Sequence, residues 1–103
     1  MPDTNGLTVD LDARVVARGS KAARLTKNEM ALFSMLHRRA GRLLAREPAL
    51  QVLFAGAERQ DEDNGANNYI RLLRRKLGPL GMKIHLVHGS GWVLEIVAEQ
   101  GKS

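Results

Sequence analysis

Residues 66–77 have the sequence ANNYIRLLRRKL, from which the rest of the architecture can be worked out. At 3.6 residues per turn, one face of a helix over this segment carries four apolar residues: Ala66, Ile70, Leu73 and Leu77. The remaining surface carries four cations and two asparagines, with no acidic residue anywhere in the segment. Like charges at i,i+3 and i,i+4 repel one another, so a polyanion would stabilise this helix.

The polar residues of this helix suit double-stranded DNA. An α-helix fits the major groove, where asparagine pairs bidentately with adenine and arginine with guanine. We therefore expect Asn67 and Asn68 to contact bases. Cations further along the helix are expected near phosphates, giving affinity and register: Arg71, Arg74, Arg75 and, at the edge of the face, Lys76. A solvated basic face, favoured by the dipole at the helix carboxyl end, remains an alternative.

The sequence before this helix predicts a sheet and a helix. Alternating apolar residues over 7–11, with shorter apolar stretches at 15–17 and 22–25, predict a small antiparallel sheet. Residues 26–29, TKNE, form a capping box, in which the hydroxyl of Thr26 accepts from the Glu29 amide and the carboxylate reaches back. A helix is predicted over about 27–39, ending at Gly41.

A second helix and a polar segment are expected in the middle of the chain. Leu43 and Leu44 are expected to bridge back to the amino-terminal sheet. Pro48 suits the first turn of a helix, whose expected buried residues are Leu50, Val52, Leu53 and Phe54. Residues 58–64 lack periodicity and are interpreted as an exposed acidic loop, with the basic helix starting at Asn64 or Gly65.

The remaining sequence predicts a hairpin and sets the domain bounds. Apolar stretches at 82–87 and 92–97 flank Gly89-Ser90-Gly91, which predicts a hairpin with a glycine-rich tip. With 103 residues the chain is expected to form one domain over 7–97, with flexible ends at 1–6 and 98–103.

Composition excludes several classes of function. The chain has no cysteine, a formal net charge of +5 and only three histidines, none at metal-ligand spacing. No serine has a catalytic context, and no apolar run approaches a membrane span. We therefore expect a cytoplasmic protein that is not an enzyme, binds no metal or cofactor, and has a polyanion as partner.

The ordered set of motifs resembles the effector domain of the OmpR/PhoB class of bacterial response regulators over roughly residues 7–97. The resemblance rests on four blocks: Leu25-Thr26-x-x-Glu29-Met30-x-Leu32-Phe33-x-x-Leu36, Gly41-Arg42-Leu43-Leu44-Ala45-Arg46-Glu47, Ile70-x-x-Leu73-Arg74-Arg75-Lys76-Leu77 and Val87-x-Gly89-x-Gly91-Trp92. It implies an α+β winged helix-turn-helix, with an amino-terminal antiparallel sheet, three helices and a carboxyl-terminal hairpin wing. The third helix would enter the major groove and the wing would lie at the adjacent minor groove.

The resemblance also implies roles for individual residues. Positions in or near the groove are matched by Asn67, Asn68 and Arg71. Positions near the phosphate backbone are matched by Tyr69, Arg74, Arg75, Arg46 and Phe54. The wing tip comprises His88 and Ser90, and the loop that contacts RNA polymerase in the family corresponds to 56–65, with the acidic residues Glu58, Asp61, Glu62 and Asp63.

The sequence departs from the family pattern at several points. The family usually has aspartate at position 67 and a small apolar residue at 68, so the operator is expected to differ. Leu72 stands where the family frequently has an arginine. The preferred interpretation is that its side chain packs or has no role, and the alternatives are contact with a thymine methyl or with a protein. His88 replaces the usual arginine, so the wing is expected to bind DNA weakly. No counterpart of the receiver domain precedes Leu7, so we expect a stand-alone regulator controlled by expression, oligomerisation or a partner, with a fragment of a longer regulator as the alternative.

Three functions follow in order of preference. The first is a sequence-specific regulator of transcription that binds double-stranded DNA, alone or as a homodimer or tandem pair, and is associated with the nucleoid. The second is a protein-interaction module that contacts RNA polymerase or another regulator, with weak or partner-dependent DNA binding. RNA binding comes third, because single-strand readers need exposed aromatic side chains and Tyr69 is the one plausible candidate.

Overall fold

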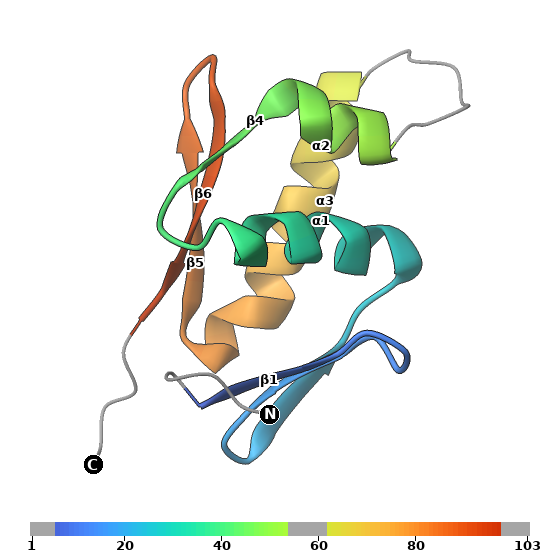
Figure 1. The fold of residues 1–103 in the computed structure, drawn as a ribbon, viewed down its shortest axis with the longest axis vertical. Helices are drawn as coiled ribbons and strands as arrows, with labels where there is room; N and C mark the ends of the chain where they lie inside the picture. Colours follow the sequence, from blue (N-terminus) through green and yellow to red (C-terminus); the bar gives the residue numbers. More distant parts are fainter. Residues whose placement is uncertain (1–5, 54–61, 98–103) are drawn as a thin grey trace.

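The computed structural model describes residues 6–53 and 62–97, with the side chains of 62–65 outside that description. The elements follow in this order: β1 (Leu7–Asp10), β2 (Val15–Arg18), β3 (Lys21–Arg24), α1 (Lys27–Arg38), β4 (Leu43–Ala45), α2 (Arg46–Leu53), α3 (Glu62–Leu77), a 3-10 turn η1 (Gly78–Leu80), β5 (Met82–Val87) and β6 (Gly91–Ile96). Figure 1 shows α1 crossing in front of α3, with one sheet at the base and the other along one side. The predicted α+β architecture is confirmed.

The amino-terminal sheet forms as the alternation predicts. Its strands are antiparallel in the order β1-β2-β3, with Val9 opposite Val16 and Val16 opposite Ala23. Leu7 and Val16 are buried and direct one face of the sheet toward the core. Alternation therefore identified the buried face at residues 7–10, because side chains of a strand point to opposite faces in turn. The extension to Leu11 is wrong, since the strand ends at Asp10 and Leu11 is 62% exposed in the turn that follows.

The capping box of α1 is present with both of its hydrogen bonds. The Glu29 amide donates to the Thr26 hydroxyl at 3.2 Å, and the Thr26 amide donates to Glu29 Oε1 at 2.9 Å. These two bonds satisfy amides that a helix start leaves without partners. The helix ends at Arg38, and Gly41 follows with φ +83°.

The short strand β4 pairs differently from the prediction. Residues 43–45 join β6 in a second sheet of order β4-β6-β5, with Leu44 opposite Trp92. The expected return to the amino-terminal sheet is therefore wrong. The physical reason is that the segment after α1 lies along the edge of β6. The Gly41 amide donates to the Leu94 carbonyl there at 2.8 Å, and β4 continues the pairing.

The helix α2 begins earlier than predicted and buries a different set of residues. It starts at Arg46, two residues before Pro48. Its buried residues are Ala49, Leu50 and Leu53, whereas Val52 is 46% exposed, so the expected burial of Val52 is wrong. At 100° per residue, position 52 lies outside the arc formed by the three buried residues. Phe54 lies outside the described residues.

The helix α3 also begins earlier than predicted. It starts at Glu62, so residues 62–64 belong to the helix and the predicted loop is too long at this end. The absence of apolar periodicity suggested a loop, but acidic residues are favoured in the first turn of a helix by its dipole. The predicted core stripe is confirmed, because Ala66, Ile70, Leu73 and Leu77 are all buried.

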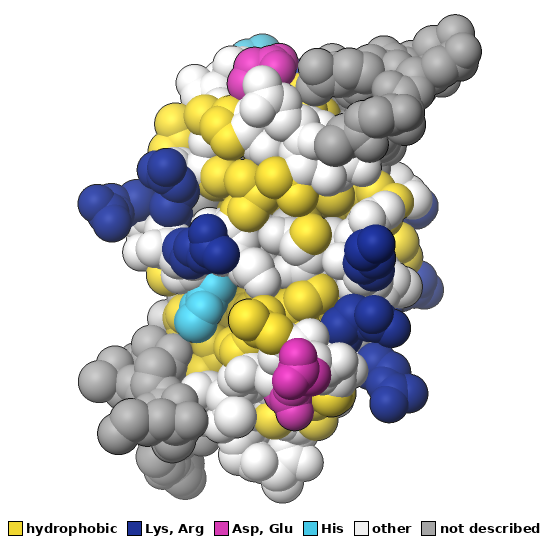
Figure 2. Space-filling view, turned by 45° about the vertical axis from the view of Figure 1, so that its right-hand side comes forward, with side chains coloured by type: hydrophobic (Ala, Val, Ile, Leu, Met, Phe, Trp, Pro, Cys, Tyr) yellow, Lys and Arg dark blue, Asp and Glu magenta, His cyan; other side chains and the backbone are white. Residues whose placement is uncertain are grey.

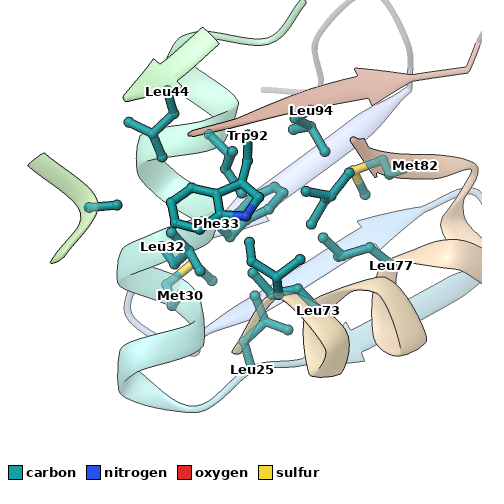
Figure 3. Packing of buried hydrophobic residues seen from close by; sticks show 14 of the residues in the cluster. Leu25, Met30, Leu32, Phe33, Leu44, Leu73, Leu77, Met82, Trp92 and Leu94 are labelled. Atoms are coloured by element: carbon teal, nitrogen blue, oxygen red, sulfur yellow. The ribbon is translucent and has the colours of Figure 1, made fainter. Parts of the chain in front are cut away.

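The predicted hairpin is β5 and β6, which form the wing and supply the centre of the core. Val87 and Gly91 are paired across the strands, and the Ser90 amide closes the turn on the Val87 carbonyl at 2.9 Å. Trp92 and Phe33 lie at the centre of the buried cluster between α1, α3 and the second sheet (Figure 3). The wing is thus anchored close to its tip by Trp92, which pairs with Leu86 next to the turn and is 1% exposed.

Arg18 is a buried link that no sequence pattern predicted. Its Nη1 donates to the Leu80 carbonyl at 2.9 Å, and its Nη2 donates to the Val97 carbonyl at 2.6 Å. These carbonyls follow α3 and β6, so one side chain joins the amino-terminal sheet to the far end of the wing. Gly81 leaves the room for it, because a Cβ there would lie 2.7 Å from Arg18 Nη1.

Candidate nucleic-acid interface

The candidate interface is the exposed face of α3. This helix packs against α1 and β5 through its apolar stripe, and its opposite side is open. The open side carries five exposed polar side chains: Asn67, Asn68, Arg71, Arg74 and Arg75. The structure therefore brings these predicted site residues together on one surface, as helical periodicity requires.

Asn68 and Arg71 form a pair on this surface. Arg71 Nη2 donates to Asn68 Oδ1 at 2.7 Å, between side chains three positions apart. A guanidinium group is only a donor, so Asn68 must present its carbonyl oxygen to Arg71. The bond uses one of five guanidinium N–H groups and leaves the others available for a further partner.

Arg74 is bonded to the wing. Its Nε donates to the Ile84 carbonyl at 3.0 Å, which joins α3 to the central part of β5. The terminal nitrogens of Arg74 have no partner within 6–53 and 62–97, so they can still reach an anion. Arg74 thus has a structural role that its predicted phosphate contact did not anticipate.

Lys76 is placed differently from the other cations of α3. Its Nζ lies 2.6 Å from Glu29 Oε1, and the Glu29 side chain is only 2% exposed. Burial alone would raise the pKa of Glu29, but the hydrogen bonds and charge of Lys76 and the bonds from Thr26 outweigh it, so this pKa lies below its ordinary value. Lys76 therefore neutralises a buried carboxylate, a role that its predicted contact with the DNA backbone did not include.

Tyr69 is held against α1. Its hydroxyl accepts from Asn28 Nδ2 at 2.9 Å, and its partly buried ring packs against the core. No local sequence pattern indicates a role for Asn28, because its partner lies 41 positions away along the chain. A ring in this position offers little free surface for stacking on a base.

Asn67 and Arg75 differ from their neighbours in having no described partner. Both are exposed, and neither side chain has a hydrogen bond or ion pair with the side chains that the structure describes, which exclude those of 62–65. Toward the described residues, their polar groups are open to a ligand. The exposed face of α3 combines these two unpaired side chains with two that are already positioned, Arg71 and Arg74.

The wing tip lies beside the start of α2. The Arg46 amide donates to the Ser90 carbonyl at 3.2 Å, so two predicted backbone-contacting regions are brought together. His88, Gly89 and Ser90 are all exposed, and none is Lys or Arg. The position of the tip depends on Gly91, since a Cβ there would lie 2.0 Å from the Leu44 carbonyl oxygen.

The predicted acidic partner segment is only partly placed. Glu58 and Asp61 lie outside the described residues. The backbone of Glu62 and Asp63 forms the start of α3, at the same end of the helix as Asn67. The segment is therefore next in sequence to the candidate interface.

A further group of cations lies away from α3. Arg38, Arg39 and Arg42 line a groove of about 380 Å³ at the end of α1, together with Met35, Leu44 and Pro48. Figure 2 shows that Lys and Arg side chains stand at both edges of this view, with hydrophobic side chains between them. The positive charge of the chain is thus distributed over more than one surface.

Two properties of the described residues bear on other functions. Residues 6–53 and 62–97 contain no group of three or more side chains that could hold a metal ion. The helices within the same ranges are too short or too polar to cross a lipid bilayer.

Comparison with known proteins identifies the family. A family described as "Transcriptional regulatory protein, C terminal" matches residues 20–94. The chain belongs to this family. These are the OmpR/PhoB-type DNA-binding domains of response regulators, so the resemblance found in the sequence is confirmed. The family consists of DNA-binding regulators of transcription.

Individual relatives cover most of this OmpR/PhoB-type domain. Response regulator ArlR of Staphylococcus haemolyticus is 36% identical over 94 residues, which are 89% of this chain and 42% of ArlR. The chain therefore spans less than half the length of that relative. The C-terminal domain of the nisin resistance regulator NsrR superposes with a TM-score of 0.74 at 25% identity, covering 92% of this chain and 97% of that domain.

A DNA complex is among the solved structures of this fold. The DNA-binding domain of Klebsiella pneumoniae RstA, solved with the RstA box, has a TM-score of 0.65 and covers 87% of this chain and 91% of that one. At 24% identity this similarity establishes the winged-helix fold alone.

Proposed function

We propose that this chain is a sequence-specific double-stranded DNA-binding regulator of transcription, with residues 7–97 as its DNA-binding unit. In this proposal α3 enters the major groove, and the wing over 82–97 lies at the adjacent minor groove or backbone. The protein would act on nucleoid DNA in the cytoplasm. The observation that carries the proposal is the exposed face of α3 over residues 66–77, where asparagines and arginines lie opposite the buried stripe and no acidic residue is present.

The proposal assigns a role to each part of this surface. Asn67, Asn68 and Arg71 lie toward the amino end of α3 and are the groove-facing set. Arg74 and Arg75 lie one turn further and supply phosphate contacts, with Arg46 at the start of α2 as a further one. Tyr69 supports this surface from its place against Asn28, and its partly buried ring argues against single-stranded RNA as the ligand.

A salt titration tests the proposal. Arg75→Ala should weaken binding to every duplex about threefold and reduce the log–log salt slope by roughly one unit, because one phosphate contact is lost. Binding is measured by fluorescence anisotropy on a selected site and on a scrambled duplex. Lys21→Ala on β3, an exposed cation far from α3 in the sequence, is the charge-matched control. An unchanged slope for Arg75→Ala would remove Arg75 from the interface.

A second candidate function is a module that contacts RNA polymerase or another regulator. The exposed Val52 on α2 and the lack of Lys or Arg at the wing tip favour it, since both suit a protein contact more than a phosphate. The acidic residues at 58–63 would belong to this contact, and pairing of two copies on DNA is compatible with both functions. Arg75→Glu separates the two functions, because it should weaken direct DNA binding more than Arg75→Ala does but leave a contact made through α2 intact.

A further inference from the structure

The hydrogen bond between Asn68 and Arg71 distinguishes two asparagines that the sequence treats alike. Both are exposed near the amino end of α3, but Asn68 Oδ1 is occupied by Arg71 Nη2 at 2.7 Å, whereas Asn67 has no described partner. Bidentate pairing of asparagine with adenine requires both the carbonyl oxygen and the amide nitrogen. Arg71 takes one of the two lone pairs of Asn68 Oδ1 and fixes the orientation of the amide, so Asn68 is less free than Asn67 to align both of its groups with an adenine.

The same bond leaves Arg71 suited to guanine. Arg71 donates one N–H to Asn68, and four of its five N–H groups stay available, which is enough for two parallel bonds to guanine O6 and N7. A long side chain loses rotamer freedom when it binds, and an arginine that is already held loses less. The hydrogen bond from Arg71 to Asn68 therefore favours a role for Asn68 in holding the arginine.

We propose that α3 reads two bases, an adenine with Asn67 and a guanine with Arg71, and that Asn68 is a positioning residue for Arg71. This inference rests on the proposed function. Asn67 and Arg71 are four residues apart, which is about 6 Å along the helix axis. Successive bases in a strand are separated by about 3.4 Å, so the two bases lie within about two base pairs of each other.

Binding-site selection on the whole chain tests the proposal. Selection with the unmodified protein should return a motif that contains adenine and guanine within this spacing. Asn67→Ala should lose the preference for adenine alone. Arg71→Ala should lose the preference for guanine, by roughly tenfold or more in relative affinity.

Asn68→Ala should weaken the guanine preference about threefold, at the position that Arg71→Ala affects, and should change no other position. The double variant should match Arg71→Ala alone. Asn68→Asp is the rescue variant, because a carboxylate still accepts from Arg71 but has no amide to donate to adenine, and it should retain the guanine preference.

Three results would overturn the positioning role. In the first, Asn68→Ala loses preference at a base position that Arg71→Ala leaves unchanged. In the second, the double variant loses more guanine preference than Arg71→Ala alone. In the third, Asn68→Ala has no effect on the selected motif. In each of these the unmodified protein still yields a motif, so the proposed function stands. A failure of the unmodified protein to select any duplex would instead overturn both proposals. Circular dichroism and affinity for a scrambled duplex serve as controls for folding.

Discussion

The exposed face of α3 and the tip of the wing are both expected to meet DNA, but the protein builds them differently. On α3 the side chains of Arg71 and Arg74 are held by other groups of the chain, at Asn68 and Ile84. At the tip, residues 88–90 are placed by backbone hydrogen bonds, and none of the three is Lys or Arg. A positioned side chain contributes to recognition, whereas a positioned backbone fixes only where the tip lies.

The largest effect is expected from breaking the placement of the wing. Gly91→Ala puts a Cβ 2.0 Å from the Leu44 carbonyl oxygen at a φ of +150°, so β4 must separate from β6. We expect the free energy of unfolding to fall by about 3 kcal/mol. Gly89→Ala is the matched control, since its Cβ would meet nothing within 4 Å and only its φ of +75° is unfavourable, at about 1 kcal/mol. Urea denaturation of both variants measures the difference, and equal losses would contradict it.

The next effect concerns the bond that joins the two regions. Arg74→Ala removes a phosphate contact and also the hydrogen bond to Ile84, whereas Arg75→Ala removes only the former. We expect Arg74→Ala to weaken DNA binding about tenfold and also to lower the melting temperature, because a net stabilisation of about 1 kcal/mol is lost. Anisotropy and thermal melting of the two variants are compared. If their melting temperatures agree, the bond to the wing contributes nothing.

A smaller effect is expected at the support of α3. Because the pKa of Glu29 is lowered in the fold, its stabilising effect is complete above the ordinary glutamate pKa of about 4.3 and is lost as the pH falls through the lower folded value. Glu29→Gln retains the capping geometry but loses the charge facing Lys76, and should cost about 1 kcal/mol near pH 7. The cost should shrink on acidification.

Urea denaturation at several pH values measures the cost of Glu29→Gln. Asp12→Asn provides the control, because it removes one carboxylate charge at an exposed turn. A cost for Glu29→Gln that stays constant down to pH values of about 3 would argue against the charged pair with Lys76.

The smallest effect is expected at the wing tip itself. His88→Arg adds a guanidinium charge at the tip, so binding should tighten about threefold and the salt slope should rise by up to one unit. His88→Gln is the neutral control. If His88→Arg changes neither the affinity nor the salt slope, the tip does not reach DNA. The exposed face of α3 would then be the DNA-binding surface and the wing tip would not.

Much of the fold was predictable because it depends on local periodicity. The four buried residues of α3, the alternation in β1 and the capping box at Thr26 are all properties of neighbouring positions. The errors occurred where two patterns competed. Residues 62–64 carry charge without apolar periodicity, yet they start a helix, and Val52 is apolar but lies off the buried face of a short helix.

The candidate site was predictable as a surface but not as a set of contacts. Helical periodicity placed Asn67, Arg71 and Arg75 together, since all of them follow from one helix. The partner of Lys76 lies 47 positions away and the partner of Tyr69 lies 41 positions away. The pairing of β4 with β6 likewise joins segments that no local pattern relates.

The sequence by itself thus determined the elements, the buried stripe of α3 and the family, because each depends on residue types at short and regular spacing. Only the tertiary structure decided which cations of α3 are free. Lys76 and Arg75 are adjacent and alike in charge, but one faces the buried Glu29 across the helix packing and the other faces solvent. A buried carboxylate requires a partner, and the packing of α1 on α3 selects which cation provides it.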